Sequence, residues 1–138
     1  MCLSKLTATY NPPLADERDA WKIVQNNHTL HNSIQLGNGE WINDPSDIEL
    51  HIGQFKYRTG FHCFLDESEA TIAFDVITKD LGLKPCDKFA LIKVRVADVT
   101  AIGLLKEMSA ILAEGNKETK TKVRGIEHCV VARRIRKV

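Results

Sequence analysis

The chain has 138 residues, of which 19 are Lys or Arg and 18 are Asp or Glu, so its formal net charge is +1 and 27% of its positions are charged. Its hydrophobic fraction of 43% supplies enough apolar material for one core of ordinary density and too little for two. This composition excludes a disordered tail, a collagen-like or coiled-coil rod and a membrane span, and it predicts a single soluble domain.

Three short strands are predicted in the first third of the chain. Residues 5–10 alternate in the manner of a strand, and Asn11-Pro12-Pro13 is expected to stop it because proline cannot donate a ladder hydrogen bond. The other two strands are predicted at 19–25 and 29–35, and Gly37-Asn38-Gly39 favours a hairpin after the third.

The clearest strand and the clearest helix follow one another. Residues 55–65 alternate strictly between an apolar face and a polar face, which predicts one long strand. A helix is expected to begin at Asp66, with capping-box spacing to Glu69, and to end at Gly82. Its predicted apolar stripe consists of Ala70, Ala73, Phe74, Ile77 and Leu81.

The C-terminal part predicts the remaining elements. Residues 88–96 indicate a strand, and the apolar stripe over 104–113 is typical of a second, amphipathic helix. A flexible polar loop is expected at 115–124, followed by a terminal strand at 126–135. This order predicts an α+β fold, namely a curved, mostly antiparallel sheet with two helices packed on one face, in a single domain that covers residues 1–138.

The candidate ligand site lies on the polar face of the predicted strand at 55–65. Lys56, Arg58 and His62 occupy alternate positions there, and Gly60 is expected to let a ligand approach the backbone. Arginine forks onto phosphate or carboxylate, and histidine donates or shuttles a proton. Under the alternative interpretation, the two cations are merely solvated and His62 packs under a loop. The predicted stacking surfaces for a bound ligand are Trp21 and Phe64.

The C-terminal segment is strongly basic. Residues 116–138 hold eight Lys or Arg and two acidic residues, a net charge of +6 that the rest of the chain offsets with −5. A second electrostatic contact, suited to phosphate-rich partners, is predicted at Arg133, Arg134, Arg136 and Lys137. Alternatively, the segment packs against the protein's own acidic residues, since no aromatic residues interleave with the basic ones.

The four cysteines predict free thiols in a reducing cytoplasm, because there is no CxxC motif and no signal-peptide pattern. His62-Cys63 and His128-Cys129 do not predict zinc, since neighbouring strand residues point to opposite sides of a sheet. A Cys–His nucleophilic pair and an N-terminal nucleophile at Cys2 are the remaining chemical alternatives. No metal and no cofactor are expected.

Several short motifs resemble known proteins. The start Met1-Cys2-Leu3-Ser4, the strand motif Tyr57-x-x-Gly60-Phe61-His62 and the closing Val130-Val131-Ala132-Arg133 resemble small phage and prophage proteins of unassigned function. The segment from Gly60 to Ala70 is also distantly similar to the strand-to-helix step of ADP-ribosyltransferase-like folds. The second resemblance implies an NAD-dependent transferase using Arg58, His62 and Glu127.

These observations favour a small, soluble, cytoplasmic binding protein of phage type, with no catalytic residues assigned. It would engage a host protein or an anionic small molecule such as a nucleotide, as an inhibitor of host defence. The alternatives are the ADP-ribosyltransferase-like enzyme and nucleic-acid binding through the basic C-terminus. No membrane contact is expected, and self-association through edge strands is a further expectation.

Overall fold

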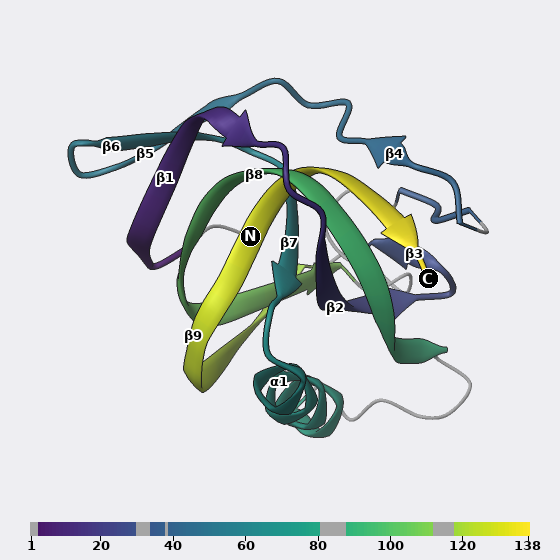
Figure 1. Ribbon diagram of the computed structural model, residues 1–138. Coiled ribbons are helices and arrows are strands. Elements are labelled where there is room, and N and C mark those ends of the chain that lie inside the picture. Colours follow the sequence, from purple (N-terminus) through teal and green to yellow (C-terminus); the bar gives the residue numbers. More distant parts are fainter. Residues whose placement is uncertain (1–2, 30–33, 38, 81–87, 112–117) are drawn as a thin grey trace.

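The computed structural model describes residues 3–29, 34–37, 39–80, 88–111 and 118–138 (Figure 1). Within these ranges the chain forms nine strands and one helix. In chain order they are β1 (Lys5–Leu14), β2 (Arg18–Gln25), β3 (His28–Thr29), β4 (Ile42–Asn43), β5 (Glu49–Ile52), β6 (Phe55–Arg58), β7 (Phe61–Phe64), α1 (Glu67–Asp80), β8 (Phe89–Ile111) and β9 (Glu118–Lys137).

Two long strands, β8 and β9, organise the main sheet. β8 pairs with β9 on one side and with β2 and then β1 on the other, always antiparallel. β7 lies between β2 and β9, so the pairings β8–β2–β7–β9 return to β8. This closure is visible as the strong curvature of β8 and β9 in Figure 1. β3 and β4 extend the sheet beside β2 and β9, and β5 and β6 form a separate two-stranded sheet.

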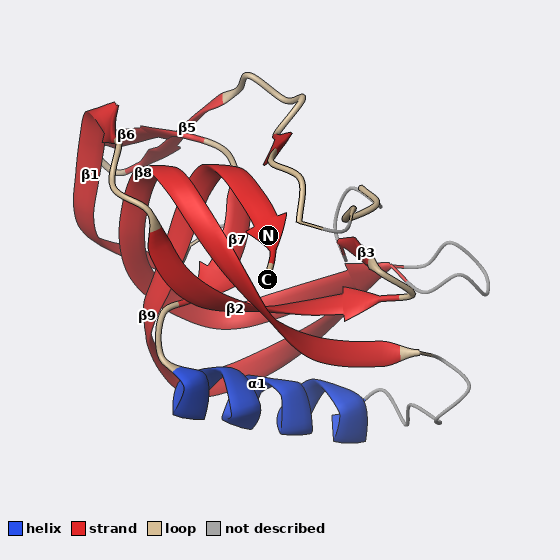
Figure 2. Cartoon of the chain, turned by 45° about the vertical axis from the view of Figure 1, so that its right-hand side comes forward, coloured by secondary structure: helices blue, strands red, loops and turns tan. Residues whose placement is uncertain are grey.

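Both faces of the central strands are covered. Residues 129–132 of β9 are all buried, because alternate residues enter two different cores. One core contains Val130 and Ala132, while Cys129 and Val131 face the other core, which lies beneath α1. Figure 2 shows α1 lying along one side of the sheet. The near-continuous apolar run in β9 follows from this burial on two sides.

The helix predicted from Asp66 is confirmed as α1. The Oδ1 atom of Asp66 accepts hydrogen bonds from the backbone N–H groups of Ser68 at 2.8 Å and Glu69 at 3.2 Å, which satisfies free donors of the first turn. Ala70, Ala73 and Ile77 are fully buried against the sheet. The predicted end at Gly82 lies outside the described residues. α1 is neither long enough nor apolar enough to cross a membrane, and the described residues contain no other helix.

The predicted α+β fold with two helices is wrong, because the protein is mostly β and its described residues form a single helix. The apolar stripe at 104–113 belongs to a strand as far as Ile111, where β8 continues its pairing with β9 from Leu105↔Ile126 to Ile111↔Glu118. Leu105 is buried while Lys106 is exposed. Apolar spacing in so short a segment fits either structure, and the distant partner strand decides in favour of β.

Other predicted boundaries also move. β1 continues through Pro12 and Pro13, which is tolerated because β1 ends the strand order and needs fewer ladder donors. The predicted strand at 29–35 is reduced to β3 and an isolated bridge, with residues 30–33 outside the described ranges. β4 pairs with β9 and does not complete the predicted hairpin. Of the predicted loop at 115–124, residues 118–124 belong to β9 and the remainder lies outside the described residues.

Candidate functional site

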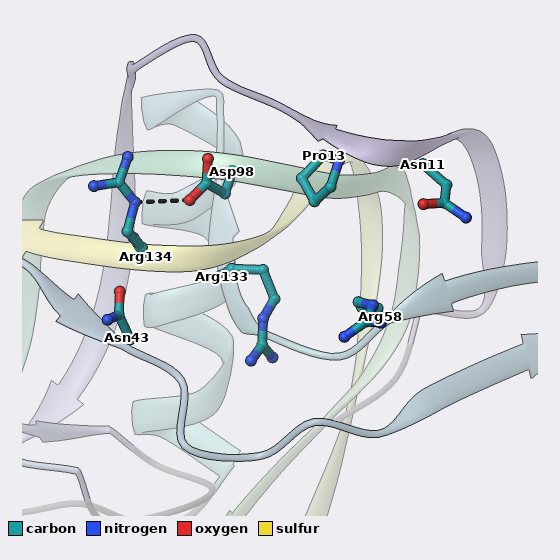
Figure 3. A pocket seen from close by; sticks show the side chains of 7 residues that line it. All are labelled: Asn11, Pro13, Asn43, Arg58, Asp98, Arg133 and Arg134. Carbon is teal, nitrogen blue, oxygen red and sulfur yellow. Dashed lines mark hydrogen bonds and ion pairs between the residues drawn. The ribbon is translucent and has the colours of Figure 1, made fainter.

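A polar cavity of about 640 Å³ lies where five strands meet. Three arginines, two asparagines, one aspartate and one proline line it (Figure 3). These lining residues are Asn11, Pro13, Asn43, Arg58, Asp98, Arg133 and Arg134. They come from β1, β4, β6, β8 and β9, so segments far apart in the sequence build one site.

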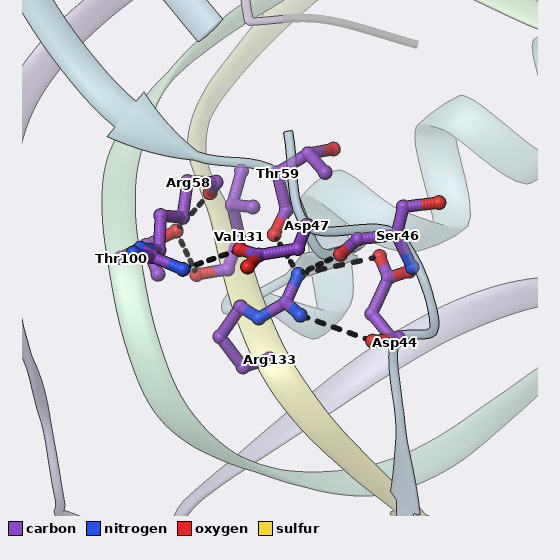
Figure 4. A network of polar contacts seen from close by, with 8 residues as sticks. All are labelled: Asp44, Ser46, Asp47, Arg58, Thr59, Thr100, Val131 and Arg133. Atoms are coloured by element: carbon purple, nitrogen blue, oxygen red, sulfur yellow. Dashed lines mark hydrogen bonds and ion pairs between the residues drawn. The ribbon is translucent and has the colours of Figure 1, made fainter. Parts of the chain in front are cut away.

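Arg133 has a structural role in this cavity. Its Nη1 donates to the carbonyl oxygens of Ser46 at 2.6 Å and Thr59 at 2.7 Å, and its Nη2 donates to that of Asp44 at 3.0 Å (Figure 4). The Asp44 carboxylate, which is buried, lies 4.0 Å from the same guanidinium. The side chain of Arg133 is only 19% exposed, and its hydrogen bonds link residues 44–46, which follow β4, to Thr59, which lies between β6 and β7.

Arg134 is held from two directions. Its Nε donates to Oδ2 of Asp98 at 2.7 Å, and its guanidinium carbon lies 4.9 Å from the ring centroid of Trp41. Arg136 lies over the same ring at 5.3 Å. Asp98 has a φ of 56°, in the left-handed region that few non-glycine residues adopt, and in this position its carboxylate meets Arg134. Because the bond to Asp98 uses Nε, the terminal nitrogens of Arg134 point away from that carboxylate (Figure 3).

Arg58 is the most exposed arginine of the cavity, with 57% of its side chain accessible. Its guanidinium pairs with the carboxylate of Asp47, which is 69% exposed. The backbone of Arg58 is fixed by a hydrogen bond, since the buried hydroxyl of Thr100 donates to the carbonyl oxygen of Arg58 at 2.7 Å. Thr100 lies at a register shift between β8 and β9, and such bulges redirect side chains. The guanidinium of Arg58 can therefore exchange hydrogen-bond partners while the backbone of Arg58 stays in place.

The charges around the cavity are balanced. Three guanidinium groups face the carboxylates of Asp44, Asp47 and Asp98. Asp44 is buried, whereas Asp47 and Asp98 are accessible to water. An incoming anion would compete most easily at the exposed pair, because such pairs contribute only about 0–1 kcal/mol.

The structure does not bring Arg58 and His62 together. The predicted strand at 55–65 is divided by residues 59–60 into β6, which pairs with β5, and β7, which pairs with β2 and β9. His62 is half-buried opposite Val131, and it is not among the residues that line the cavity. Its carbonyl oxygen accepts a hydrogen bond from Nζ of the buried Lys22 at 2.8 Å.

The other predicted ligand contacts also lie elsewhere. Trp21 is paired with Phe64 in the register of β2 and β7, where Phe64 is buried in the core beneath α1 and Trp21 packs against that core. Lys56 is exposed on β6 but does not line the cavity. Glu127, predicted for the transferase, is exposed on β9 next to α1, where its backbone N–H donates to Glu69.

The space beside Gly60 is occupied by the backbone of β9. A Cβ atom added to Gly60 would lie 2.3 Å from the carbonyl oxygen of Ala132 on β9. Gly60 therefore allows a close approach of the β9 backbone, and not of a ligand as the sequence led us to expect.

The predicted C-terminal contact is largely engaged within the molecule. Arg133 binds backbone carbonyls, Arg134 pairs with Asp98, and Lys137 donates from Nζ to Oδ1 of Asn27 at 3.0 Å. All four predicted residues, Arg136 included, are partly buried. Of this group, only Arg133 and Arg134 line the cavity.

Sequence reasoning missed Asn11, Pro13, Asn43 and Asp98. The one available signal was the carboxylate of Asp98, an isolated charge among apolar residues just after the predicted strand at 88–96, where a charged side chain needs a partner if it is buried. Asn11 was predicted only as part of the strand stop at Asn11-Pro12-Pro13, and no local pattern marked it as a neighbour of Asn43.

No family model, curated protein or solved structure matches this chain. The resemblances to phage proteins and to ADP-ribosyltransferases, the host-directed role and the cytoplasmic location therefore stay predictions.

The buried thiols do not support a Cys–His nucleophile. Cys63 and Cys129 are free and buried on β7 and β9. Burial raises the pKa of the Cys63 thiol, and burial with the nearby Cys63 raises the pKa of Cys129 to about 12. Thiols of this kind stay protonated at neutral pH and are poor nucleophiles. Cys2 lies outside the described residues.

A second polar cluster joins α1 to β9. Nδ1 of His128 lies 2.7 Å from Oε2 of Glu69, and Oε1 of Glu69 accepts the backbone N–H of His128 at 3.3 Å. Asp66 completes a set of side chains whose oxygen or nitrogen atoms lie within 4.8 Å of one another, close enough to share a cation. Helix capping by Asp66 and the bridge from Glu69 to His128 already account for this arrangement.

This bridge predicts a pH-dependent stability. The hydrogen bond that His128 donates to Glu69, together with the negative charge of Glu69, raises the pKa of His128 above its usual 6.5. A raised folded-state pKa adds stability that is fully present below the unfolded pKa and is lost as pH rises through the folded pKa. The advantage of the wild type over His128→Gln in the free energy of unfolding should therefore be largest below about pH 6.5 and should shrink as the pH rises through the raised folded-state pKa of His128.

Urea unfolding across this range measures the effect. In a Glu69→Gln background, the same His128→Gln comparison should depend much less on pH, because the charge of Glu69 is gone and only the smaller effects of Glu127 and Asp66 still raise the pKa of His128. A pH dependence as large in that background as in the wild type would contradict the assignment to Glu69.

Proposed function

We propose that the protein binds a small anionic molecule that carries a phosphate group, such as a nucleotide, in the arginine-lined cavity. The observation that carries this proposal is that Arg58, Arg133 and Arg134 line one cavity, where Arg133 is bound to backbone carbonyls of the cavity wall. Arginine presents a planar fork of donors that matches the oxygen atoms of phosphate. Asn11 and Asn43 add amide groups for the hydroxyl or carbonyl groups of the same ligand.

The lining favours binding over catalysis. Among the described residues that line the cavity there is no His, Cys, Ser, Thr or Lys to act as nucleophile or proton shuttle. Asp98 is the one acid or base there, and its carboxylate is engaged by Arg134. Arg58, His62 and Glu127 do not share this site, so the geometry lends no support to the transferase alternative.

The experiment measures ligand binding and compares two cations on the same strand. Inorganic phosphate, ribose 5-phosphate, AMP and NAD are titrated by calorimetry at constant ionic strength, with thermal shift as a screen. Arg58→Ala should weaken phosphate binding about tenfold or more, since hydrogen bonds between charged groups contribute about 1.5–3 kcal/mol. Lys56→Ala removes an exposed cation from β6 that does not line the cavity, and it should change affinity less than about twofold.

Equal losses in the two variants would attribute binding to general surface charge. Ligand recovered chemically intact after incubation supports a binding protein, whereas release of nicotinamide from NAD would select an enzyme. Binding that survives Arg58→Ala unchanged would remove the cavity from the proposal.

A further inference from the structure

The guanidinium of Arg58 already holds an anion that belongs to the protein. The carboxylate of Asp47 contacts Nη1 of Arg58, the same kind of contact that a ligand oxygen would make (Figure 4). Both side chains are more than half exposed, at 57% and 69%. Water therefore reaches the pair, and a released carboxylate can be rehydrated at little cost.

The backbone around Asp47 is fixed on both sides. Before it, the carbonyls of Asp44 and Ser46 are bound by Arg133, and the N–H of Ser46 donates to Oδ1 of Asp44 at 2.8 Å. After it, the carbonyl of Ile48 accepts the N–H of Thr59 at 2.9 Å. The Asp47 side chain is thus presented to Arg58 by a fixed segment, and it can leave the pair by rotating its own side-chain bonds.

We propose that Asp47 is a tethered competitor that raises the anion concentration needed to fill the arginine cavity. This inference rests on the proposed function, because it concerns the same site. A tethered group acts at an effective concentration of about millimolar or higher, which a free monoanion of the same chemistry must overcome. A phosphate dianion has a larger charge and more acceptor oxygens for the arginine fork, so it displaces Asp47 at a lower concentration than a carboxylate does.

The test removes the competing charge without changing the shape of the side chain. Asp47→Asn is titrated with inorganic phosphate and with acetate at about pH 7.5, where phosphate is mostly a dianion, at constant ionic strength. The affinity for phosphate should rise about two- to fivefold, the range for loss of an exposed ion pair. The affinity for acetate, which should be the weaker ligand, should rise by a similar factor, because both anions displace the same carboxylate.

Asp19→Asn is the matched control. Asp19 is also an exposed carboxylate in an ion pair, with Arg95 at 3.1 Å, but it lies on β2 and its partners do not line the cavity. This variant changes the net charge by the same amount as Asp47→Asn but leaves the pair of Asp47 and Arg58 intact. Both titrations should therefore be the same as in the wild type. Thermal unfolding of both variants verifies that they are folded.

The outcomes separate the two proposals. If the wild type binds phosphate through Arg58 but Asp47→Asn binds phosphate equally or more weakly, the competitor role is overturned while the proposed function stands. If Asp19→Asn tightens binding as much as Asp47→Asn, general charge explains the effect and the inference fails. If no anion binds either the wild type or Asp47→Asn, the proposed function fails together with the inference.

Discussion

Gly60→Ala is expected to lower the free energy of unfolding by about 2–4 kcal/mol. The added Cβ would lie 2.3 Å from the carbonyl oxygen and 2.7 Å from the carbonyl carbon of Ala132, and 3.2 Å from Cγ1 of Val131. Two of these three atoms are backbone. β9 cannot easily retreat there, because Val131 and Ala132 are fully buried in cores on opposite faces of the strand.

A smaller effect acts in the opposite direction. Replacing glycine by alanine restricts the unfolded chain and by itself stabilises a protein by about 0.4–1 kcal/mol. The clash should outweigh this gain, because relief requires a backbone shift in β7 or β9, which would disturb the ladder from Phe61↔Ala132 to Phe64↔Cys129.

Gly37→Ala is the matched control, since a Cβ there would meet only the side chain of Glu40, at an ordinary distance of 3.6 Å. Urea unfolding followed by circular dichroism should place this variant within about 0.5 kcal/mol of the wild type. Equal stability of the Gly60→Ala and Gly37→Ala variants would contradict the close approach of β9 to residue 60.

Arg133→Met is expected to lower the free energy of unfolding by about 3–4 kcal/mol. Methionine keeps the apolar stem of the side chain but removes the donors to the carbonyl groups of Asp44, Ser46 and Thr59. The buried Asp44 carboxylate would also lose the positive charge 4.0 Å away. Partly buried acceptors without partners are costly, and the exposed fraction of 19% leaves little water to replace the guanidinium.

Arg58→Met serves as the control within the same cavity. Its side chain is 57% exposed and pairs with an exposed carboxylate, so its loss should cost less than about 1 kcal/mol. Arg133→Lys should fall between the two, because an ammonium group cannot span three carbonyls as the guanidinium does. Similar losses for Arg133→Met and Arg58→Met in urea unfolding would show that the carbonyl network adds no stability.

Local patterns predicted the elements whose causes are local. The start of α1 follows from the capping position of Asp66 and the spacing of Ala70, Ala73 and Ile77, all within one short segment. Alternation likewise identified β6 and β7 as extended chain. The same kind of pattern failed at residues 104–113, because the pairing of Leu105 with Ile126 lies outside any local window.

The cavity was predicted only in part. Arg58, Arg133 and Arg134 were identified as anion contacts from their charge, yet they were assigned to two different places. The structure unites them because β9 runs alongside β7 and its end meets β4, which brings Arg134 opposite Asn43. The predicted grouping of Arg58 with His62 assumed one straight strand, and the chain passes instead from one sheet to another between β6 and β7.

By itself, the sequence determined the single helix cap, the extended character of most apolar segments and the supply of arginine that an anion site needs. The tertiary structure alone decided that β8 and β9 pair along most of their length and that Gly60 lies against the backbone of a neighbouring strand. It also decided that the guanidinium of Arg133 is hydrogen-bonded to backbone carbonyls while that of Arg58 stays exposed. The reason is physical. Capping and periodicity act over a few residues, whereas strand pairing and burial depend on partners dozens of residues away.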